Sequence, residues 1–184
     1  MPFTGLPVAV RRGEVDAARP WSLSPAHLRR APVAPALVLP SPNGSAIAAM
    51  VAGLVVAGCL RNAAAVAHWL LAAGYGVPSR PVVVIAAGER WPDQTLRPAL
   101  EDLLGAGAIV EALAAGGAAS LSPEAGAVRA VHRATGDIRS TLRDCASGRE
   151  LVARGYAEDV DIAAESDQSA VVPVRRGGAF APAA

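Results

Sequence analysis

ALVLPSPNGSAIAAMVAGLVVAGCLRN, residues 36–62, decides the expected fold because it places two apolar runs around one polar turn. Residues 36–39 form a short apolar run that favours a strand, and the Pro, Asn and Gly residues after it favour a turn. Ser45 precedes a helix-capable run, and its hydroxyl is placed to cap the first exposed backbone N–H groups of that helix. The stretch therefore predicts a strand, a polar turn and a helix N-terminus.

The turn has a functional interpretation as an anion site. At the carboxyl end of a strand in an open α/β sheet, free N–H groups and the positive end of a helix favour an anion. Asn43, Gly44 and Ser45 are then candidate substrate-binding residues. The same residue types are ordinary in turns and caps, so a purely structural interpretation stays open.

Two further units of strand and helix follow this stretch. Residues 54–57 predict a second strand, and a helix is expected from Arg61 to about residue 73. Residues 81–88 are the clearest strand, because their β-branched run is apolar on both faces, as in a central parallel strand. A helix over residues 98–115 comes next. The expected buried stripe of this helix is Leu100, Leu103, Leu104, Val110 and Leu113. This order predicts an α/β fold, with a mainly parallel sheet and flanking helices in one Ala-rich domain.

The remaining segments complete the expected domain. Ser122 before Pro123 predicts a capped helix start, and one or two further helices are expected over residues 137–155. Residues 159–165 are expected to form a final short helix or strand. Residues 1–35 are expected to be loosely structured, residues 36–174 to form the α/β domain, and residues 175–184 to be a frayed tail.

Composition excludes several functional classes. The chain has 184 residues, enough for one domain with a core, and 52% of them are hydrophobic. All 17 basic residues are Arg, against 16 acidic ones, and no basic stripe accompanies them, which argues against nucleic acid as a partner. The lack of a long apolar run argues against a membrane span, and the charged N-terminal region argues against a signal peptide, so a cytoplasmic location is expected. Cys59 and Cys145 have no metal-binding spacing and are expected to be buried thiols.

Two pairs of side chains are candidates for chemistry. Glu101 and Asp102 lie in the first turns of the helix that follows the best strand, and such oxygen ligands suit Mg²⁺. They could instead only offset the helix dipole. Arg61 and Asn62 follow the second strand, and arginine suits bidentate recognition of phosphate or sulfonate. A solvated surface arginine is the alternative.

The other polar groups are weaker candidates. The loop after residue 88 carries three charged side chains that could line the cleft or be solvated: Glu89, Arg90 and Asp93. None of the three histidines has a visible partner in the sequence. No Gly-x-Ser-x-Gly turn and no phosphate-binding Gly-x-x-x-x-Gly-Lys loop is present, which excludes those hydrolase and nucleotide-binding classes.

Six short pieces occur in a fixed order along the chain: Ser41–Ser45, Gly58–Asn62, Val84–Gly88, Glu101–Gly107, Ser147–Leu151 and Glu158–Val160. This order resembles the 2-phosphosulfolactate phosphatase family. The resemblance implies an α/β fold and a Mg²⁺-dependent phosphatase that converts 2-phospho-3-sulfolactate to 3-sulfolactate and phosphate, a step of coenzyme M biosynthesis. Under this hypothesis Glu101 and Asp102 are catalytic and bind the metal, Asn43 to Ser45 hold phosphate, and Arg61 with Asn62 holds the acidic tail of the substrate.

The sequence departs from the family pattern in two places. The usual Thr-Thr-Asn-Gly-Thr is here Ser-Pro-Asn-Gly-Ser, in which Pro42 is expected to stiffen the turn. The usual opening strand, with its aspartate and Arg-Ala-Thr-Thr-like turn, has no counterpart in residues 1–35. A shortened member with uncovered apolar faces is therefore expected, and with it a homo-oligomer. The alternative function is a non-catalytic anion-binding remnant of the fold.

Overall fold

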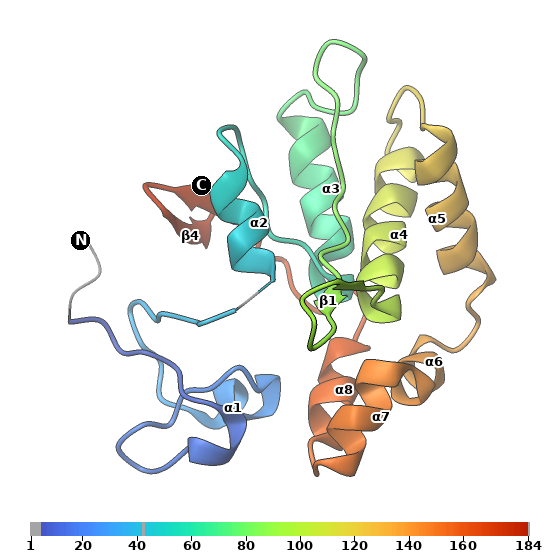
Figure 1. The fold of residues 1–184 in the computed structure, drawn as a ribbon. Coiled ribbons are helices and arrows are strands. Elements are labelled where there is room, and N and C mark those ends of the chain that lie inside the picture. The colour runs from blue at the N-terminus through green and yellow to red at the C-terminus, as the bar shows by residue number, and fades with distance from the viewer. Residues whose placement is uncertain (1–4, 42, 184) are drawn as a thin grey trace.

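A computed structural model describes residues 5–41 and 43–183, and these residues are mainly helical (Figure 1). The elements in chain order are η1 (Arg12–Glu14), α1 (Pro25–Arg30), α2 (Gly44–Met50), η2 (Leu60–Asn62), α3 (Ala63–Ala72), β1 (Glu89–Arg90), β2 (Leu96–Arg97), α4 (Leu100–Ala115), α5 (Pro123–Ala134), α6 (Ile138–Asp144), α7 (Ala146–Ala153), α8 (Ala157–Ala163), β3 (Pro173–Arg176) and β4 (Ala179–Pro182). Helices α3, α4 and α5 stand side by side, and α6 to α8 pack below them.

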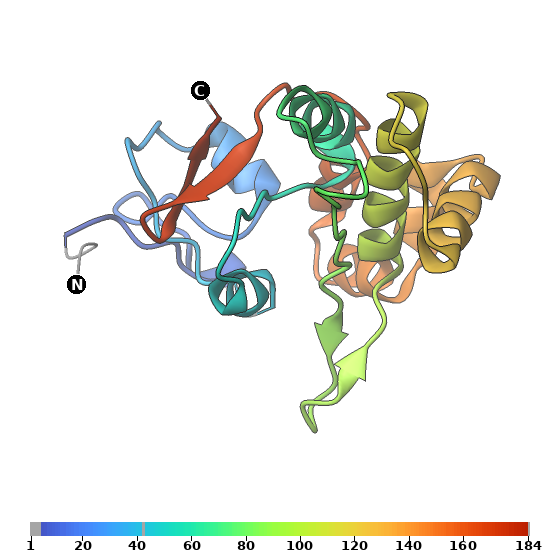
Figure 2. The same ribbon diagram turned by 90° about the horizontal axis from the view of Figure 1, so that it is seen from above.

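The expected parallel sheet is wrong. The four strands form two separate antiparallel pairs, β1 with β2 and β3 with β4. Figure 2 shows the β1–β2 hairpin projecting away from the helices. Within the described part of the chain, parallel pairing is limited to two isolated bridges, Val8 with Val38 and Val10 with Ser22. The fold is therefore mainly helical and not α/β.

The reason for this difference lies in the segments that were expected to be strands. Residues 54–57 contain one antiparallel bridge, between Val56 and Val174, and residues 81–88 pair with no strand among the described residues. A run of β-branched residues favours an extended backbone, but a sheet also needs a neighbouring strand about 4.8 Å away. The hydrophobic contacts of residues 82–84 go to the cluster around α3 and α4 instead.

The helix predictions are largely confirmed. Helix α4 begins two residues later than expected and ends at the expected residue, and α5 begins at Pro123 with the Ser122 hydroxyl accepting from the Ala125 N–H. The buried stripe of α4 is confirmed at three of its five positions. Leu100 and Leu103 are instead more than a third exposed.

Two hydrophobic clusters hold the helices together. The larger one joins α3 to α4 and β3, and its buried members are Ala63, Val66, Ala67, Leu70, Ile109, Leu113, Val172 and Val174. The smaller one joins η2 and α4 to the α6–α8 group through Leu60, Leu104, Leu142 and Val160. Helix α4 contributes to both clusters, so it positions its N-terminal carboxylates against both parts of the fold.

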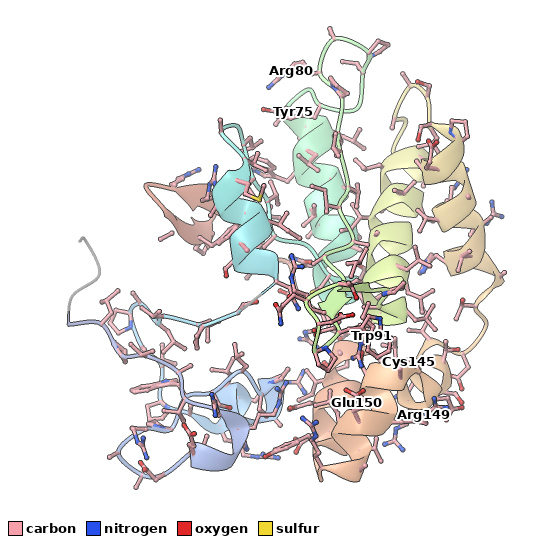
Figure 3. All side chains as sticks on the ribbon, in the orientation of Figure 1. Tyr75, Arg80, Trp91, Cys145, Arg149 and Glu150 are labelled. Carbon is pink, nitrogen blue, oxygen red and sulfur yellow. The ribbon has the colours of Figure 1, made fainter. Side chains whose placement is uncertain are left out.

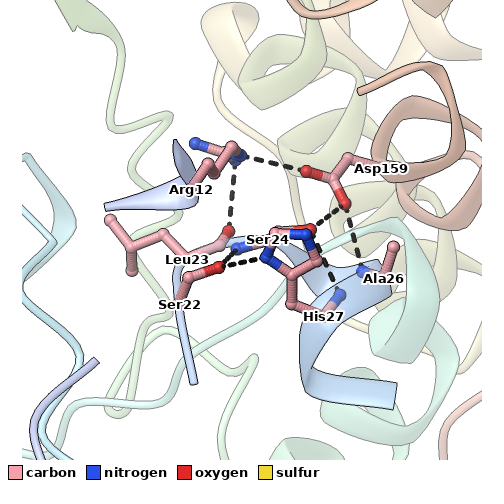
Figure 4. Close-up of polar contacts among 7 residues, drawn as sticks. All are labelled: Arg12, Ser22, Leu23, Ser24, Ala26, His27 and Asp159. Carbon is pink, nitrogen blue, oxygen red and sulfur yellow. Dashed lines mark hydrogen bonds and ion pairs between the residues drawn. The ribbon is translucent and has the colours of Figure 1, made fainter. Parts of the chain in front are cut away.

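The N-terminal segment is attached to α8 through a buried carboxylate (Figure 4). Asp159 is 3% exposed and accepts hydrogen bonds from the Ser24 hydroxyl at 2.6 Å, the Ala26 N–H at 3.1 Å and the Arg12 guanidinium at 3.0 Å. Ser24 also caps α1 by accepting from the His27 N–H at 3.2 Å. A buried carboxylate that is paired in this way fixes the approach of α1 to α8.

The domain boundaries at residues 35 and 174 stay a prediction. Residues 173–182 form the β3–β4 hairpin, in which Val174 pairs with Ala181. No helix of the described residues is both long enough and apolar enough to cross a membrane.

Candidate active site

The carboxylates Glu101 and Asp102 lie in the first turn of α4, beside a cavity of about 230 Å³. Residues 58–60 and residues 84–87 form other walls of this cavity. The helix N-cap, Ala99, offers no side-chain oxygen, so the two acidic residues supply the negative charge that favours a helix N-terminus. The pair therefore combines a structural role with a position in a cavity.

Asp102 is held in place by the turn that follows residues 81–87. Its Oδ2 accepts a hydrogen bond of 2.7 Å from the Gly88 N–H. Gly88 has φ of +72°, and a Cβ there would lie 2.8 Å from the side chain of Leu96, so the turn requires glycine. Burial raises the pKa of Asp102, and the negative charges of Glu101 and Glu89 raise it further, while the Gly88 hydrogen bond lowers it. Three carboxylates thus share one region with too little positive charge to compensate them fully.

Glu101 faces α7 through Cys145. The Cys145 Sγ lies 3.7 Å from Glu101 Oε2 and 3.1 Å from the Leu142 carbonyl, and it accepts from the Gly148 N–H at the start of α7. Burial raises the pKa of the Cys145 thiol, and the charge of Glu101 adds to this effect. The thiol is therefore a neutral neighbour of the carboxylate and not a reactive thiolate.

The turn at Asn43 reaches the same region. The Asn43 side-chain amide donates to Glu89 Oε2 at 2.9 Å. The predicted capping role of Ser45 is wrong, because its hydroxyl bonds the Ser41 carbonyl and α2 begins at Gly44. Pro42, which was expected to stiffen this turn, lies outside the described residues. The structure therefore brings Asn43, by way of Glu89, toward the carboxylates of α4.

Arg61 is directed elsewhere. Its guanidinium forms an ion pair with Glu165 and also donates to the Ile162 carbonyl at 3.3 Å. Arg29 pairs with the same Glu165 carboxylate. The two arginines lower the pKa of Glu165 to about 2, with Arg29 contributing most. Arg61 thus joins η2 to the end of α8.

Asn62 is also used to hold the backbone. It is 5% exposed, its Oδ1 accepts from the Cys59 N–H at 2.8 Å, and its amide donates to the carbonyls of Val171 at 3.0 Å and Ala57 at 3.3 Å. These bonds satisfy the polar atoms of a buried side chain and join residues 57–59 to Val171. The structure thus places Arg61 and Asn62 in structural contacts instead of beside the pair on α4.

Arg97 is the residue that sequence reasoning missed. Only 14% of its side chain is exposed, and its guanidinium donates to Glu150 at 2.7 Å and to the Ser147 hydroxyl at 3.2 Å. It also lies over the ring of Trp91, at 5.3 Å from the ring centroid. Glu150 raises the pKa of Arg97 most, and the charges of Glu89 and Glu101 add to the effect.

The Arg97–Glu150 ion pair joins β2 to α7, and Trp91 and Glu150 are labelled in this part of the molecule in Figure 3. Arg97 is therefore a cation next to the acidic region. In the sequence, Arg97 could have been recognised only by its position between residues 81–88 and the acidic start of the next helix. The other residues of this loop are typical of a solvent-exposed segment.

Comparison of the sequence with known proteins identifies the family of this chain. A sequence profile of a family described as 2-phosphosulpholactate phosphatase matches residues 9–178. The chain belongs to this family. It is also similar to a protein of Deinococcus radiodurans named "Probable 2-phosphosulfolactate phosphatase", with 33% identity over 150 residues. That match covers 80% of this chain and 59% of the relative, so the chain spans about three fifths of the length of the curated relative.

The metal that the family resemblance implies can be tested against these residues. Among the described residues, no group of three or more His, Cys, Asp or Glu side chains is placed to hold a metal ion. Mg²⁺ usually takes only one or two protein carboxylates and completes its shell with water and substrate phosphate. Glu101 and Asp102 supply such oxygen donors. Burial raises the pKa of Asp102 most and the charges of Glu101 and Glu89 add to this, so a cation beside the carboxylate would favour its ionised form. The donor set of this member of the 2-phosphosulpholactate phosphatase family therefore fits Mg²⁺.

Proposed function

We propose that this chain hydrolyses a small phosphorylated acid, 2-phospho-3-sulfolactate, to 3-sulfolactate and phosphate at the cavity beside the N-terminus of α4. Membership of the 2-phosphosulpholactate phosphatase family supports this reaction class. The observation that carries the proposal is Asp102, a partly buried carboxylate whose pKa is raised by burial and by two carboxylates near it. Carboxylates with a perturbed pKa beside a cavity are typical of functional sites.

The residues of the site would have distinct roles. Glu101 and Asp102 would hold Mg²⁺, which when bound polarises the phosphoryl oxygens and neutralises their charge. The Gly88 N–H fixes the direction of the Asp102 carboxylate. Asn43 orients Glu89, and either residue could contact the phosphate or the water around it.

Arg97 would supply positive charge for an anionic substrate. Its guanidinium is already held by Glu150 and Ser147, so it is pre-oriented and loses little side-chain entropy when it contacts an anion. Its charge also counteracts the repulsion among the carboxylates near α4. In this proposal Arg97 takes over the role of recognising the acidic substrate that the sequence suggested for Arg61.

The experiment is a phosphate-release assay on 2-phospho-3-sulfolactate with and without Mg²⁺. Asp102→Asn and Glu101→Gln are expected to lower kcat/KM by on the order of a hundredfold or more, since each removes a charged metal ligand. Glu124→Gln is the matched control, because Glu124 is an exposed acid in the first turn of α5 and does not line the cavity beside the N-terminus of α4. Full activity in both site variants would refute the assignment.

Anion binding without turnover is the second candidate. It is favoured by Arg97, which Glu150 and Ser147 hold next to the acidic region, because a guanidinium can bind an anion without taking part in chemistry. A thermal-shift screen with phosphorylated and sulfonated acids separates the two functions. A rise in Tm with no phosphate release at high protein concentration supports binding alone. The link to coenzyme M biosynthesis and a cytoplasmic location stay predictions from the sequence.

A further inference from the structure

Residues 82–87 form an extended segment with an open backbone. Within the described part of the chain, none of their N–H or C=O groups forms a hydrogen bond to another backbone group. The nearest backbone bonds involve Arg80, just before the segment. In Figure 1 the segment is the green strand-like trace that runs along α3 and α4. Unpaired groups of this kind are a template for another strand.

The side chains of the segment alternate as in a strand that is buried on one face. Val82 and Val84 pack against the larger hydrophobic cluster, whereas Val83 is 81% exposed and Ile85 is 56% exposed. The residues between Arg80 and Glu89 carry no charge that would discourage pairing. The outer face of the segment is therefore apolar and uncovered.

An apolar groove runs beside the segment. It is a cavity of about 620 Å³ between residues 81–86, α4 and α5. Its walls include Val110 and Leu113 of α4 and Val128 of α5. The groove leaves the backbone edge of residues 82–87 accessible, and an accessible edge can take up a further strand through main-chain hydrogen bonds.

We propose that the occupant of this edge is the same segment of a second copy of the chain, paired antiparallel about a two-fold axis at Val84. A two-fold axis that relates two antiparallel copies of one segment must lie midway between the two copies of a single residue, so that this residue lies opposite itself. With the axis at Val84, the exposed Val83 lies opposite the partner's Ile85, and the converse pair forms on the other side of the axis. The two most exposed apolar side chains of the segment then cover each other.

The charges and the proline select this register. With the axis at Val84, Arg80 lies opposite the partner's Gly88 and next to the partner's Glu89, so opposite charges meet at both ends. An axis at Ile85 would place Arg80 opposite the partner's Arg90, a destabilising pair of like charges. If Val84 is a hydrogen-bonded pair, Pro81 falls in a non-hydrogen-bonded pair, where its missing N–H is not needed.

The first experiment measures the mass of the full chain by sedimentation or light scattering. The wild type is expected to reach twice 18.6 kDa at micromolar concentration. Val83→Lys combined with Ile85→Lys is expected to weaken the dimer by on the order of tenfold or more, because like charges would then face each other. Val33→Lys is the control, since Val33 is 99% exposed and lies outside the segment. Circular dichroism checks that the helices of each variant are intact.

The second experiment tests the register. Opposite residues of a non-hydrogen-bonded pair have Cα atoms about 4.5 Å apart, which suits a disulfide. A mixture of Val83→Cys and Ile85→Cys chains is expected to form mixed disulfides between positions 83 and 85, identified by mass spectrometry, with far less 83–83 or 85–85 product. A monomeric wild type, a dimer that the double lysine variant leaves unchanged, or dominant 83–83 or 85–85 links would each overturn the proposal.

Discussion

The contact between α4 and α5 is expected to depend on Gly107. A Cβ built on Gly107 would lie 2.6 Å from His132 Cβ and 2.7 Å from the Val128 carbonyl oxygen, both in α5. Ordinary contacts of a Cβ begin near 3.4 Å. The Gly107→Ala variant must therefore move α5 away from α4 by several tenths of an ångström, because the neighbouring atoms belong to backbone and to the base of a side chain.

The size of the effect follows from two opposing terms. Inserting a methyl group into a packed contact costs about 1–3 kcal/mol, and two close contacts place Gly107 at the upper end of this range. Alanine stabilises a helix interior by about 0.5–1 kcal/mol relative to glycine. The free energy of unfolding of Gly107→Ala is therefore expected to fall by about 2–2.5 kcal/mol.

Gly126 provides the matched control. It lies inside α5, and a Cβ there meets nothing within 4 Å. Gly126→Ala is expected to gain about 0.5–1 kcal/mol from helix propensity alone. Urea unfolding of both variants, followed by circular dichroism, measures the difference. If Gly107→Ala is as stable as Gly126→Ala, the close packing of α4 on α5 is not what holds these helices together.

Three further predictions concern single side chains. In the presence of EDTA, Asp102→Asn is expected to raise the free energy of unfolding near neutral pH, because burial raises the pKa of Asp102 above its usual 3.8 and the folded chain loses stability as the carboxyl ionises. The gain should vanish below that usual pKa in urea titrations, and a loss at neutral pH would contradict the account. Glu165→Gln is expected to lower Tm above pH 4.5 but not near pH 2. Arg29 and Arg61 lower the pKa of Glu165 from 4.5 to about 2, so the stabilisation that Glu165 provides disappears as the pH falls from 4.5 to about 2. A Tm difference that does not change with pH would refute this account. Asn62→Ala is expected to cost about 1–3 kcal/mol, since it removes the hydrogen bonds by which this buried side chain joins Cys59 to Val171, and an unchanged urea midpoint would count against this role.

Local signals in the sequence predicted the helices well. Ser24 before Pro25 and Ser122 before Pro123 both act as caps, because a hydroxyl one residue before an N1 proline is close to free N–H groups whatever the rest of the fold does. The same locality explains the failure at residues 81–88. Their backbone is extended as predicted, but strand pairing depends on segments elsewhere, and composition carries no information about those.

The site shows the same division between local and distant causes. Glu101 and Asp102 lie beside a cavity next to the Gly88 turn, since the helix start and the preceding turn are close in sequence, and their role in chemistry stays a prediction. The position of Arg61 depends instead on Glu165, which is 104 residues away and was not considered as a partner. Arg97 was missed for the same reason, because its burial comes from Glu150 on α7.

These contacts also explain why family motifs mix packing with chemistry. In the piece Glu101–Gly107 the first two residues face the cavity, whereas Gly107 is needed where α5 crosses. The piece Gly58–Asn62 is mostly structural, because the Asn62 side chain joins residues 57–59 to Val171 and Arg61 reaches the end of α8. A motif match therefore supports the fold along its whole length, but supports chemistry only at positions whose polar atoms are not already satisfied by the protein. By that criterion the carboxylates at the start of α4, which line the cavity and are not paired with a cation among the described residues, are the candidate positions for chemistry in the matched region.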